Sequence, residues 1–528
     1  MWAILHEPCD ENVIRAGVAR STCTKARGRW ILAATILASS MAFIDGTVVN
    51  VALPALQTNL NASAVDVQWV IEAYSLLLSA FLLVGGSLGD HYGRRRVFLI
   101  GTALFAIASV ACGLSATIGQ LIAARGFQGF GAALLIPGSL AIISNSFSEQ
   151  ERGRAIGTWS GFSAITAGIG PVLGGWLIEH VSWRAVFFIN LPIAFLVIVV
   201  SLRHVAENSD QERSRIDWIG AILAVLGLGA LVYGLIESSR PGFSDRSVTA
   251  VLILAGLFLI AFLVVEARSS HPMLPLGLFR SRIFAGTNLL TFLLYAALSG
   301  TLFFVPLNLI QVQHYSPTAA GAALLPFILI MSLLSRWSGG LVARYGPKPP
   351  LVLGPLIVAL GYVAFALPGI GGSYWTTFFP AMFALGLGMA ISVAPLTTTV
   401  MNSVSQHRAG IASGVNNAVA RTAGLLAIAL LGIVMLGVFR SELDRHLRES
   451  QISVSDSESL HADSTKLAAI EIPHNQDSTT QQQMRRAIDD SFVSGFRTVM
   501  LIGAGLAVAS AITALFFIAS AQRKDLTI

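Results

Sequence analysis

Two charged side chains stand in stretches of sequence that are otherwise almost wholly apolar. Asp45 interrupts FIDGTVVNVALP, and Arg125 interrupts LIAARGFQGFGAALLIPG. A charged group costs about 2.5 to 3.5 kcal/mol at the centre of a membrane helix on insertion scales, so each should face a partner or a polar cavity. A carboxylate in such a place can take up and release a proton. Asp45 is therefore the first candidate for a proton carrier.

Arg125 could control the proton affinity of that carboxylate. Gln128 and Gly129 follow it at three and four residues and therefore share its face of a helix. Burial raises the proton affinity of an acid and a nearby guanidinium lowers it, so a change in their separation could switch Asp45 between binding and release. Two plainer alternatives stay open. Asp45 could only hydrogen-bond neighbouring helices, and Arg125 could only stabilise the bundle as a donor.

Four polar residues in apolar surroundings are candidates for contact with a substrate: Glu72, Gln128, Asn308 and Gln311. Glu72, in QWVIEAYSLL, could attract a cationic substrate with aromatic neighbours that supply cation-π contact. Equally, it could be an interfacial residue of a membrane helix. Asn308 and Gln311 could line a cavity or simply satisfy each other.

Composition identifies a membrane protein and excludes several other classes. Of the 528 residues, 54% are hydrophobic and 12% are charged, about half the roughly 25% charged content of soluble domains. The net charge is +6, but the basic residues are scattered and form no stripe for nucleic acid. Cys9, Cys23 and Cys112 are widely spaced and show no disulfide or metal-ligand pattern. No Walker loop or catalytic constellation occurs, so we expect no enzyme, metal or cofactor.

Long apolar runs predict the helices that must position these residues. Runs of roughly 18 or more mostly apolar residues can cross a bilayer. We therefore expect an all-α membrane protein with fourteen spanning helices, near residues 30–54, 68–89, 97–115, 119–146, 155–179, 185–202, 216–238, 247–267, 283–311, 318–343, 351–370, 376–401, 409–439 and 493–520.

The distribution of Lys and Arg predicts the orientation of the chain. The tail 1–29 and the short loops after every second helix are rich in these residues, whereas the short loops on the other side hold few. By the positive-inside rule both termini are then cytoplasmic. The polar segment 440–492 falls outside. It could begin with a short amphipathic helix, and its Ser- and Gln-rich middle reads as a flexible, solvated loop.

The segment GSLGDHYGRRR, from Gly86 to Arg96, must form a short cytoplasmic hairpin between the second and third helices. Glycines such as Gly86 and Gly93 permit a tight turn and close bundle contact. Asp90, with Arg94 and Arg95, could pair with the cytoplasmic ends of helices in one access state and release them in another. Positive-inside anchoring alone would explain the arginines but not the acid.

The fifth expected helix contains GPVLGGW, in which small residues recur at close spacing. Gly170 and Gly174 are four residues apart and Gly175 follows, so backbones can touch there. Pro171 removes one backbone hydrogen bond and bends the helix. We expect this face to pack tightly against another bundle. The alternative is that these glycines serve close packing alone.

Two landmarks in the first half of the chain recur in the second half at nearly the same separation. GGLVARYGPK from Gly339 repeats the spacing of GSLGDHYGRR from Gly86, and Arg408 repeats Arg152. This repeat predicts two homologous bundles of six helices, 30–203 and 283–520, with two inserted helices in 216–268 between them. Parallel repeats of this kind are typical of transporters that rock two bundles about a central site.

Together these motifs resemble the major facilitator superfamily, and within it the fourteen-helix drug:proton antiporters. The segment after the second helix, the acid of the first helix, the R-x-x-Q-G pattern at Arg125 and the G-P-x-x-G-G pattern at Gly170 carry the resemblance. It implies that Asp45 and Arg125 serve proton coupling, that Gly86 to Arg96 acts as a gate, and that Gly170 to Gly175 marks an exporter rather than a symporter.

The resulting hypothesis is a proton-coupled exporter of hydrophobic or cationic drugs in the bacterial inner membrane that works by alternating access. Its partners are a small-molecule substrate, protons and membrane lipid, and in a two-membrane bacterium a periplasmic adaptor that segment 440–492 could contact. The alternatives are export of an endogenous metabolite such as an amino acid, lipid or siderophore, and a non-transporting membrane sensor. A sensor without transport should have lost its charges within the membrane, and the presence of Asp45 and Arg125 argues against that alternative.

Overall fold

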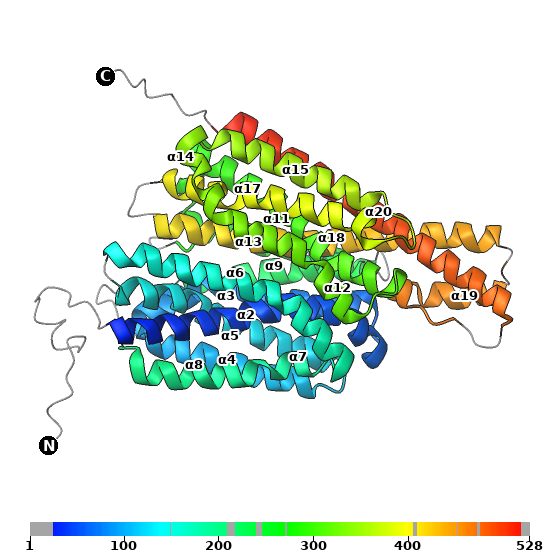
Figure 1. Ribbon diagram of the computed structural model, residues 1–528, viewed down its shortest axis with the longest axis horizontal. Coiled ribbons are helices and arrows are strands. Elements are labelled where there is room, and N and C mark those ends of the chain that lie inside the picture. The colour runs from blue at the N-terminus through cyan, green and yellow to red at the C-terminus, as the bar shows by residue number, and fades with distance from the viewer. Residues whose placement is uncertain are drawn as a thin grey trace, which may run out of the picture.

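The computed structural model describes residues 25–518, apart from a few short internal segments, and every regular element in that part of the chain is a helix. The parts not described within this range are residue 148 and residues 208–216, 239–244, 270–271, 405–408, 451, 453 and 473–475. The helices run largely along the long axis of the molecule (Figure 1). We call the end at which α2 begins and α20 ends the near end, and the opposite end the far end.

The first half of the chain forms one bundle. Ser63 and Asp66 form a capping box that starts its second long helix, and Gly93, with φ +104°, separates that helix from the next. In this bundle α3 and α4 pack along α5, while α2 packs along α6 and α8. The elements are α2 (Lys25–Leu60), α3 (Ala64–Tyr92), α4 (Arg94–Leu114), α5 (Ile118–Ser146), α6 (Glu149–His180), α7 (Ala185–Phe188) and α8 (Asn190–His204).

The last part of the chain forms a second bundle. Within it α15 packs on α17 and α20, and α11 packs on α18 and α20. Proline shapes several elements, for example at the junction before α13, where Pro326 occupies the first turn. The elements are η1 (Leu276–Arg280), α11 (Arg282–Leu307), η2 (Asn308–Val312), α12 (Pro317–Ala323), α13 (Leu325–Gly339), α14 (Leu341–Tyr345), α15 (Lys348–Ala366), α16 (Tyr374–Thr377), α17 (Phe379–Asn402), α18 (Ala409–Glu449), α19 (Val454–Ala462), η4 (Ser464–Ala469) and α20 (Ser478–Phe517).

Two helices between the bundles, α9 (Trp218–Glu237) and α10 (Arg246–Arg268), pack against each other. α9 also contacts α3 of the first bundle and α18 of the second, so it covers a seam between them. The outer helix α10 leaves large apolar residues such as Ile253, Leu257 and Ile260 exposed. An apolar face of this size suits contact with lipid.

Thirteen helices in the described part of the chain are long and apolar enough to cross a membrane. They correspond to thirteen of the fourteen expected segments. The remaining segment, 155–179, lies within α6, which has 32 residues but is not one of the thirteen. Several side chains of α6 lie outside the described residues, and the helix packs along α2 as an expected span would.

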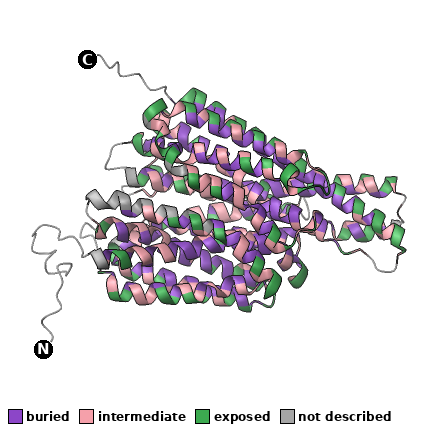
Figure 2. Ribbon diagram, in the orientation of Figure 1, coloured by how far each residue is buried: buried purple, intermediate pink, exposed green. Residues whose placement is uncertain are grey.

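The segment 440–492, expected to be largely a flexible loop, is mostly helical. α18 continues to Glu449 and α20 already begins at Ser478, so both helices extend well past their expected ends at 439 and 493. Apolar side chains four residues apart explain the extension: Leu443 and Leu447 on one helix are buried together with Met484 and Ile488 on the other. We call 440–492 the far-end hairpin; it projects beyond the bundles and carries buried residues along its length (Figures 1 and 2).

Candidate functional site

The carboxylate of Asp45 lies inside the first bundle and is completely buried. It accepts hydrogen bonds from three side chains. Arg125 Nη1 donates to Oδ2 at 2.5 Å, Gln128 Nε2 donates to Oδ1 at 2.8 Å, and Asn190 Nδ2 donates to Oδ1 at 3.2 Å. The structure therefore brings together Asp45, Arg125 and Gln128, the residues that the sequence singled out on two different helices.

Arg125 is held in place by groups from two helices. Its Nε donates to the Val70 carbonyl oxygen at 3.0 Å, and its Nη1 also donates to Gln128 Oε1 at 2.7 Å. The guanidinium carbon lies 4.2 Å from the centre of the Tyr74 ring, a cation-π distance. Because several partners fix the guanidinium, movement of α2 is the simplest way to change its distance from Asp45.

Sequence analysis missed two polar residues of this cluster. Asn190, at the start of α8, and Ser109, in α4, are both fully buried. Ser109 Oγ accepts from Gln128 Nε2 at 2.9 Å and from Asn190 Nδ2 at 3.2 Å. Cys112 Sγ lies 3.6 Å from Gln128 Oε1 as a weak donor. A polar residue inside an apolar run is the signal that could have found them.

Five helices thus converge on one carboxylate: α2, α3, α4, α5 and α8 supply Asp45, Tyr74, Ser109, Arg125 and Asn190 respectively. A buried ion pair holds only while both charges stay close and their remaining hydrogen bonds are satisfied. If the two groups move apart, each is left as an uncompensated buried charge. The relative position of the helices therefore decides whether the cluster is satisfied.

The small residues of α6 let that helix pack closely on the turn of α2 that carries Asp45. A Cβ atom at Gly170 would lie 2.1 Å from Thr47 Oγ1, and a Cβ atom at Gly174 would lie 2.2 Å from Val48 Cγ2. No larger residue fits at these distances without displacing α2. This half of the motif therefore faces its own bundle.

The other half of the same motif faces the second bundle. A Cβ atom at Gly175 would lie 2.2 Å from the Pro317 carbonyl oxygen, and a Cβ atom at Gly321 would lie 2.1 Å from the Pro171 carbonyl oxygen. Backbone atoms of α6 and α12 therefore touch across the bundle boundary. α6 lies between α12 and the part of α2 that holds Asp45, so motion at the boundary can reach the buried acid.

The segment between α3 and α4 pairs with a residue of its own bundle. Gly93 adopts φ +104°, and Glu207, just beyond α8, lies so close that a Cβ atom at Gly93 would be 2.5 Å from Glu207 Oε1. Arg95 donates its backbone N–H to the same oxygen at 3.1 Å, and the Nε atoms of Arg95 and Arg96 lie 3.7 and 3.6 Å from Glu207 Oε2. These pairs join the turn to the near end of α8.

The other residues singled out in that segment are Gly86, Asp90 and Arg94. A Cβ atom at Gly86 would make ordinary contact with Pro137, 3.8 Å away, and Arg94 begins α4. The side chain of Asp90 lies outside the described residues. The proposed release of this segment between access states therefore stays a prediction.

Glu72 is closed off from solvent in this arrangement of the bundles, and its contact with a substrate stays a prediction. Its side chain is fully buried, and both carboxylate oxygens lack a hydrogen-bond partner among the residues that the structure describes. Glu72 shares a face of α3 with Trp69 and Leu76, and Leu76 packs against α9 and α18. The acid is therefore enclosed where the inserted helix covers the seam between the bundles.

The other expected substrate residues do not meet Glu72. Gln128 belongs to the Asp45 cluster, and Asn308 is buried in η2, with an Oδ1 that has no partner within the described chain. Gln311, one turn further, donates from Nε2 to Gln57 Oε1 at 2.7 Å across the bundle boundary. The four candidates therefore lie in three separate places rather than in one substrate site.

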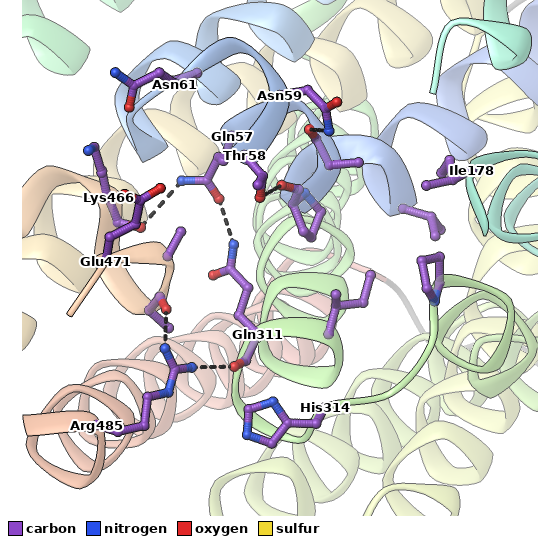
Figure 3. A pocket seen from close by; sticks show the side chains of 18 residues that line it. Gln57, Thr58, Asn59, Asn61, Ile178, Gln311, His314, Lys466, Glu471 and Arg485 are labelled. Atoms are coloured by element: carbon purple, nitrogen blue, oxygen red, sulfur yellow. Dashed lines mark hydrogen bonds between the residues drawn. The ribbon is translucent and has the colours of Figure 1, made fainter. Parts of the chain in front are cut away.

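A cavity of about 560 Å³ lies at the far end, where α2, α6, η2 and the far-end hairpin meet (Figure 3). We call it the far-end cavity. Gln57 donates from Nε2 to the Lys466 carbonyl oxygen at 3.3 Å, and Arg485 donates from Nη2 to the Gln311 carbonyl oxygen at 2.6 Å. The hairpin is thus bonded to both bundles around this cavity. Groups of three or more His, Cys, Asp or Glu side chains able to hold a metal are absent from the described part of the chain.

The sequence profile of the Major Facilitator Superfamily matches residues 35–428. The chain belongs to the major facilitator superfamily. It is a multi-pass membrane transporter rather than an enzyme, and such transporters act on small molecules. A crystal structure of a bacterial homologue of the human lysosomal transporter Spinster, inward-facing and unoccupied, shares this facilitator's fold with a TM-score of 0.64; it is 17% identical and covers 93% of this chain and 98% of its own.

Curated relatives of this facilitator are resistance and export proteins. It is 35% identical to the multidrug resistance protein Stp of Mycobacterium tuberculosis, over 79% of this chain and 78% of the relative. It is 31% identical to the tetracenomycin C resistance and export protein of Streptomyces glaucescens, over 95% and 94%. It is 35% identical to a puromycin resistance protein of Streptomyces alboniger, over 79% and 84%.

Proposed function

We propose that this facilitator is a proton-coupled exporter of hydrophobic or cationic drugs in the bacterial plasma membrane, with its near end in the cytoplasm. The names of its relatives, which include multidrug resistance and drug export, support the substrate class. The single observation that carries the coupling is the buried contact between Asp45 and Arg125. The far-end hairpin would then lie outside, where an adaptor protein of the cell envelope could reach it.

Proton uptake follows from the geometry around Asp45. The guanidinium of Arg125 lies 2.5 Å from the carboxylate, so we assign this arrangement to the state that has released its proton. When α2 moves relative to α5, the charge partner is lost and the acid binds a proton from the side to which it is then open. Return of the guanidinium expels that proton to the other side.

Contacts between the bundles support a state closed at the far end. Gln311 Nε2 donates to Gln57 Oε1, and Gln68 Nε2 donates to the Ile428 carbonyl oxygen at 3.3 Å. Thr318 N–H donates to Glu179 Oε2, also at 3.3 Å. Release of a drug to the outside requires these bonds to break. Each of these hydrogen bonds contributes a net free energy of about 0.5 to 1.5 kcal/mol. One proton moving through 100 mV supplies roughly 2.3 kcal/mol, which is of the same order as the free energy needed to break them.

α6 provides the mechanical link between the gate and the proton site. Its backbone touches α12 at Gly175 and packs on Thr47 and Val48 of α2 through Gly170 and Gly174. Because the backbones of α6 and α12 touch directly, and α6 presents glycines to the side chains of Thr47 and Val48, we expect α6 to move together with its neighbours. Rocking of the second bundle therefore shifts the turn of α2 that carries Asp45.

The test is drug efflux in vesicles with an imposed pH gradient. Asp45→Asn should abolish proton-driven efflux of ethidium and puromycin while it leaves the folded protein intact. Asp245→Asn is the matched control, since this exposed acid caps α10 and asparagine caps a helix equally well. Retained proton-driven efflux in Asp45→Asn would refute the coupling. Lack of transport of every hydrophobic cation by the wild type would favour export of an endogenous metabolite instead.

A further inference from the structure

The far-end cavity has two unlike walls. Pro54, Ile178, Ile310 and Pro317 supply apolar surface from both bundles, and the far-end hairpin supplies polar groups on the opposite side. At about 560 Å³ the cavity falls within the roughly 300 to 1,000 Å³ of pockets that bind drug-sized molecules. A compound with an apolar body and a polar end would match this division.

Most charges around the cavity are already neutralised. Lys466 Nζ lies 3.1 Å from Asp463 Oδ2, and Arg485 Nη2 lies 2.9 Å from Asp489 Oδ1. The guanidinium of Arg485 also donates hydrogen bonds to the backbone carbonyl oxygens of Ala468 and Gln311. Because Lys466 and Arg485 are already paired, neither would bind an anionic ligand strongly.

Glu471 is the exception among the lining residues. Its side chain is exposed, and no ion pair or hydrogen bond joins its carboxylate to another residue in the described part of the chain. Figure 3 shows it beside Lys466 on the hairpin side of the cavity. The lining thus presents one uncompensated negative charge opposite an apolar wall. The amide nitrogen of Asn59 donates to the Ala55 carbonyl, and no hydrogen bond to its side-chain oxygen comes from the described part of the chain.

We propose that the far-end cavity is a ligand site, an exit site that holds exported compounds with an apolar body and a protonated amine. Glu471 supplies the countercharge, and the apolar wall holds the body. The inference rests on the proposed export function, which makes the far end the exit side. It narrows the proposed substrates to hydrophobic amines. It also places them outside the Asp45 cluster, which has no exposed surface for a drug.

The strength of the site follows from the exposure of Glu471. An exposed ion pair contributes little, and a partly enclosed one somewhat more, so loss of the charge should weaken amine binding roughly fivefold. Weak binding is appropriate for an exit site, since a compound held tightly there would not leave.

Protection of a cysteine at the cavity provides the test. The probe pair is puromycin, which carries a free amine, and N-acetylpuromycin, in which that amine is capped. The full-length chain in nanodiscs carries Cys9→Ser, Cys23→Ser and Thr58→Cys, because Thr58 lines the cavity and Cys112 is buried. The rate of maleimide labelling is measured against the concentration of each compound.

Puromycin should protect Thr58→Cys at roughly fivefold lower concentration than N-acetylpuromycin. Adding Glu471→Gln should remove that difference, whereas Glu458→Gln, an exposed acid of the same hairpin outside the lining, should keep it. Absence of protection, or equal protection by both compounds in the chain with Glu471, would overturn the exit site. If Asp45-dependent efflux persists in that case, the exit site fails while the proposed export function stands.

Discussion

At the scale of single residues, the contact between Arg125 and Asp45 predicts unequal effects of removing either partner. Arg125→Ala leaves a fully buried carboxylate without its charge partner, which should cost about 3 to 5 kcal/mol of stability. Adding Asp45→Asn to Arg125→Ala should recover much of that loss, because the uncompensated charge is gone. Thermal unfolding of the two single variants and the double variant measures this coupling. Additive losses would show that the pair is not a unit.

Glu72 leads to a different expectation. Its buried oxygens have no hydrogen-bond partner among the described residues, so no contact offsets the cost of burying this carboxyl group. Glu72→Gln, which is neutral and similar in shape, should keep or raise the melting temperature and leave ethidium efflux unchanged. Glu72→Lys should unfold the protein. A folded Glu72→Gln variant without efflux would instead give this carboxyl a part in transport.

Individual polar residues were predictable from the sequence to the extent that apolar neighbours made them stand out. Asp45 and Arg125 are charged within apolar runs, and burial of both followed from the cost of an unpaired charge. Asn190 and Ser109 are also polar within apolar runs, but they are neutral, so this signal is weaker than the one that a charge gives. The surroundings of Glu72 depend on how α9 docks on α3, which periodicity within one helix does not specify.

At the scale of elements, the contact of α6 with α12 predicts a sharp requirement for glycine. Gly175→Ala would place its Cβ 2.2 Å from the Pro317 carbonyl oxygen, a backbone atom that cannot rotate away. The bundles should then separate at the far end, and proton-driven efflux should fall at least tenfold. Gly256→Ala in α10 is the control, because nothing lies within 4 Å of its added Cβ. Efflux by Gly175→Ala equal to the control would show that the contact is dispensable.

The elements themselves were largely predictable where the apolar signal was continuous. Thirteen described helices coincide with expected spans because a bilayer demands long apolar runs. The far-end hairpin escaped prediction because Leu443, Leu447, Met484 and Ile488 recur among many Ser, Gln and charged residues, which lower the mean hydropathy. Its helices are stabilised by packing on each other, and that packing partner lies far away in the sequence.

At the scale of the whole molecule, the internal repeat predicted two bundles but not where they touch. The tight approaches of α6 to α12 and the bonds of Gln57 and Gln68 to the second bundle arise from one particular relative tilt of two rigid units. A sequence that serves alternating access has to be compatible with more than one tilt. Contacts between the bundles are therefore the least predictable part of the fold.

The far-end contact between the two bundles predicts how cross-linking should affect transport. Gln57 and Gln311 belong to different bundles and meet at 2.7 Å through their side chains. With Gln57→Cys and Gln311→Cys in a chain that lacks Cys9 and Cys23, a short bifunctional thiol reagent with a cleavable disulfide should join the bundles at the far end. Because release to the outside requires that end to open, efflux should stop and should return after reduction.

A cross-link within one bundle provides the comparison. Gln311 and Arg485 lie next to each other in the second bundle, where Arg485 Nη2 reaches the Gln311 carbonyl oxygen at 2.6 Å. Joining Gln311→Cys to Arg485→Cys leaves the two bundles free to rock, so efflux should continue. If both cross-links stop efflux equally, the block arises from immobilising the far-end hairpin. If neither does, drugs leave without separation of Gln57 from Gln311, and the far-end contacts are not a gate.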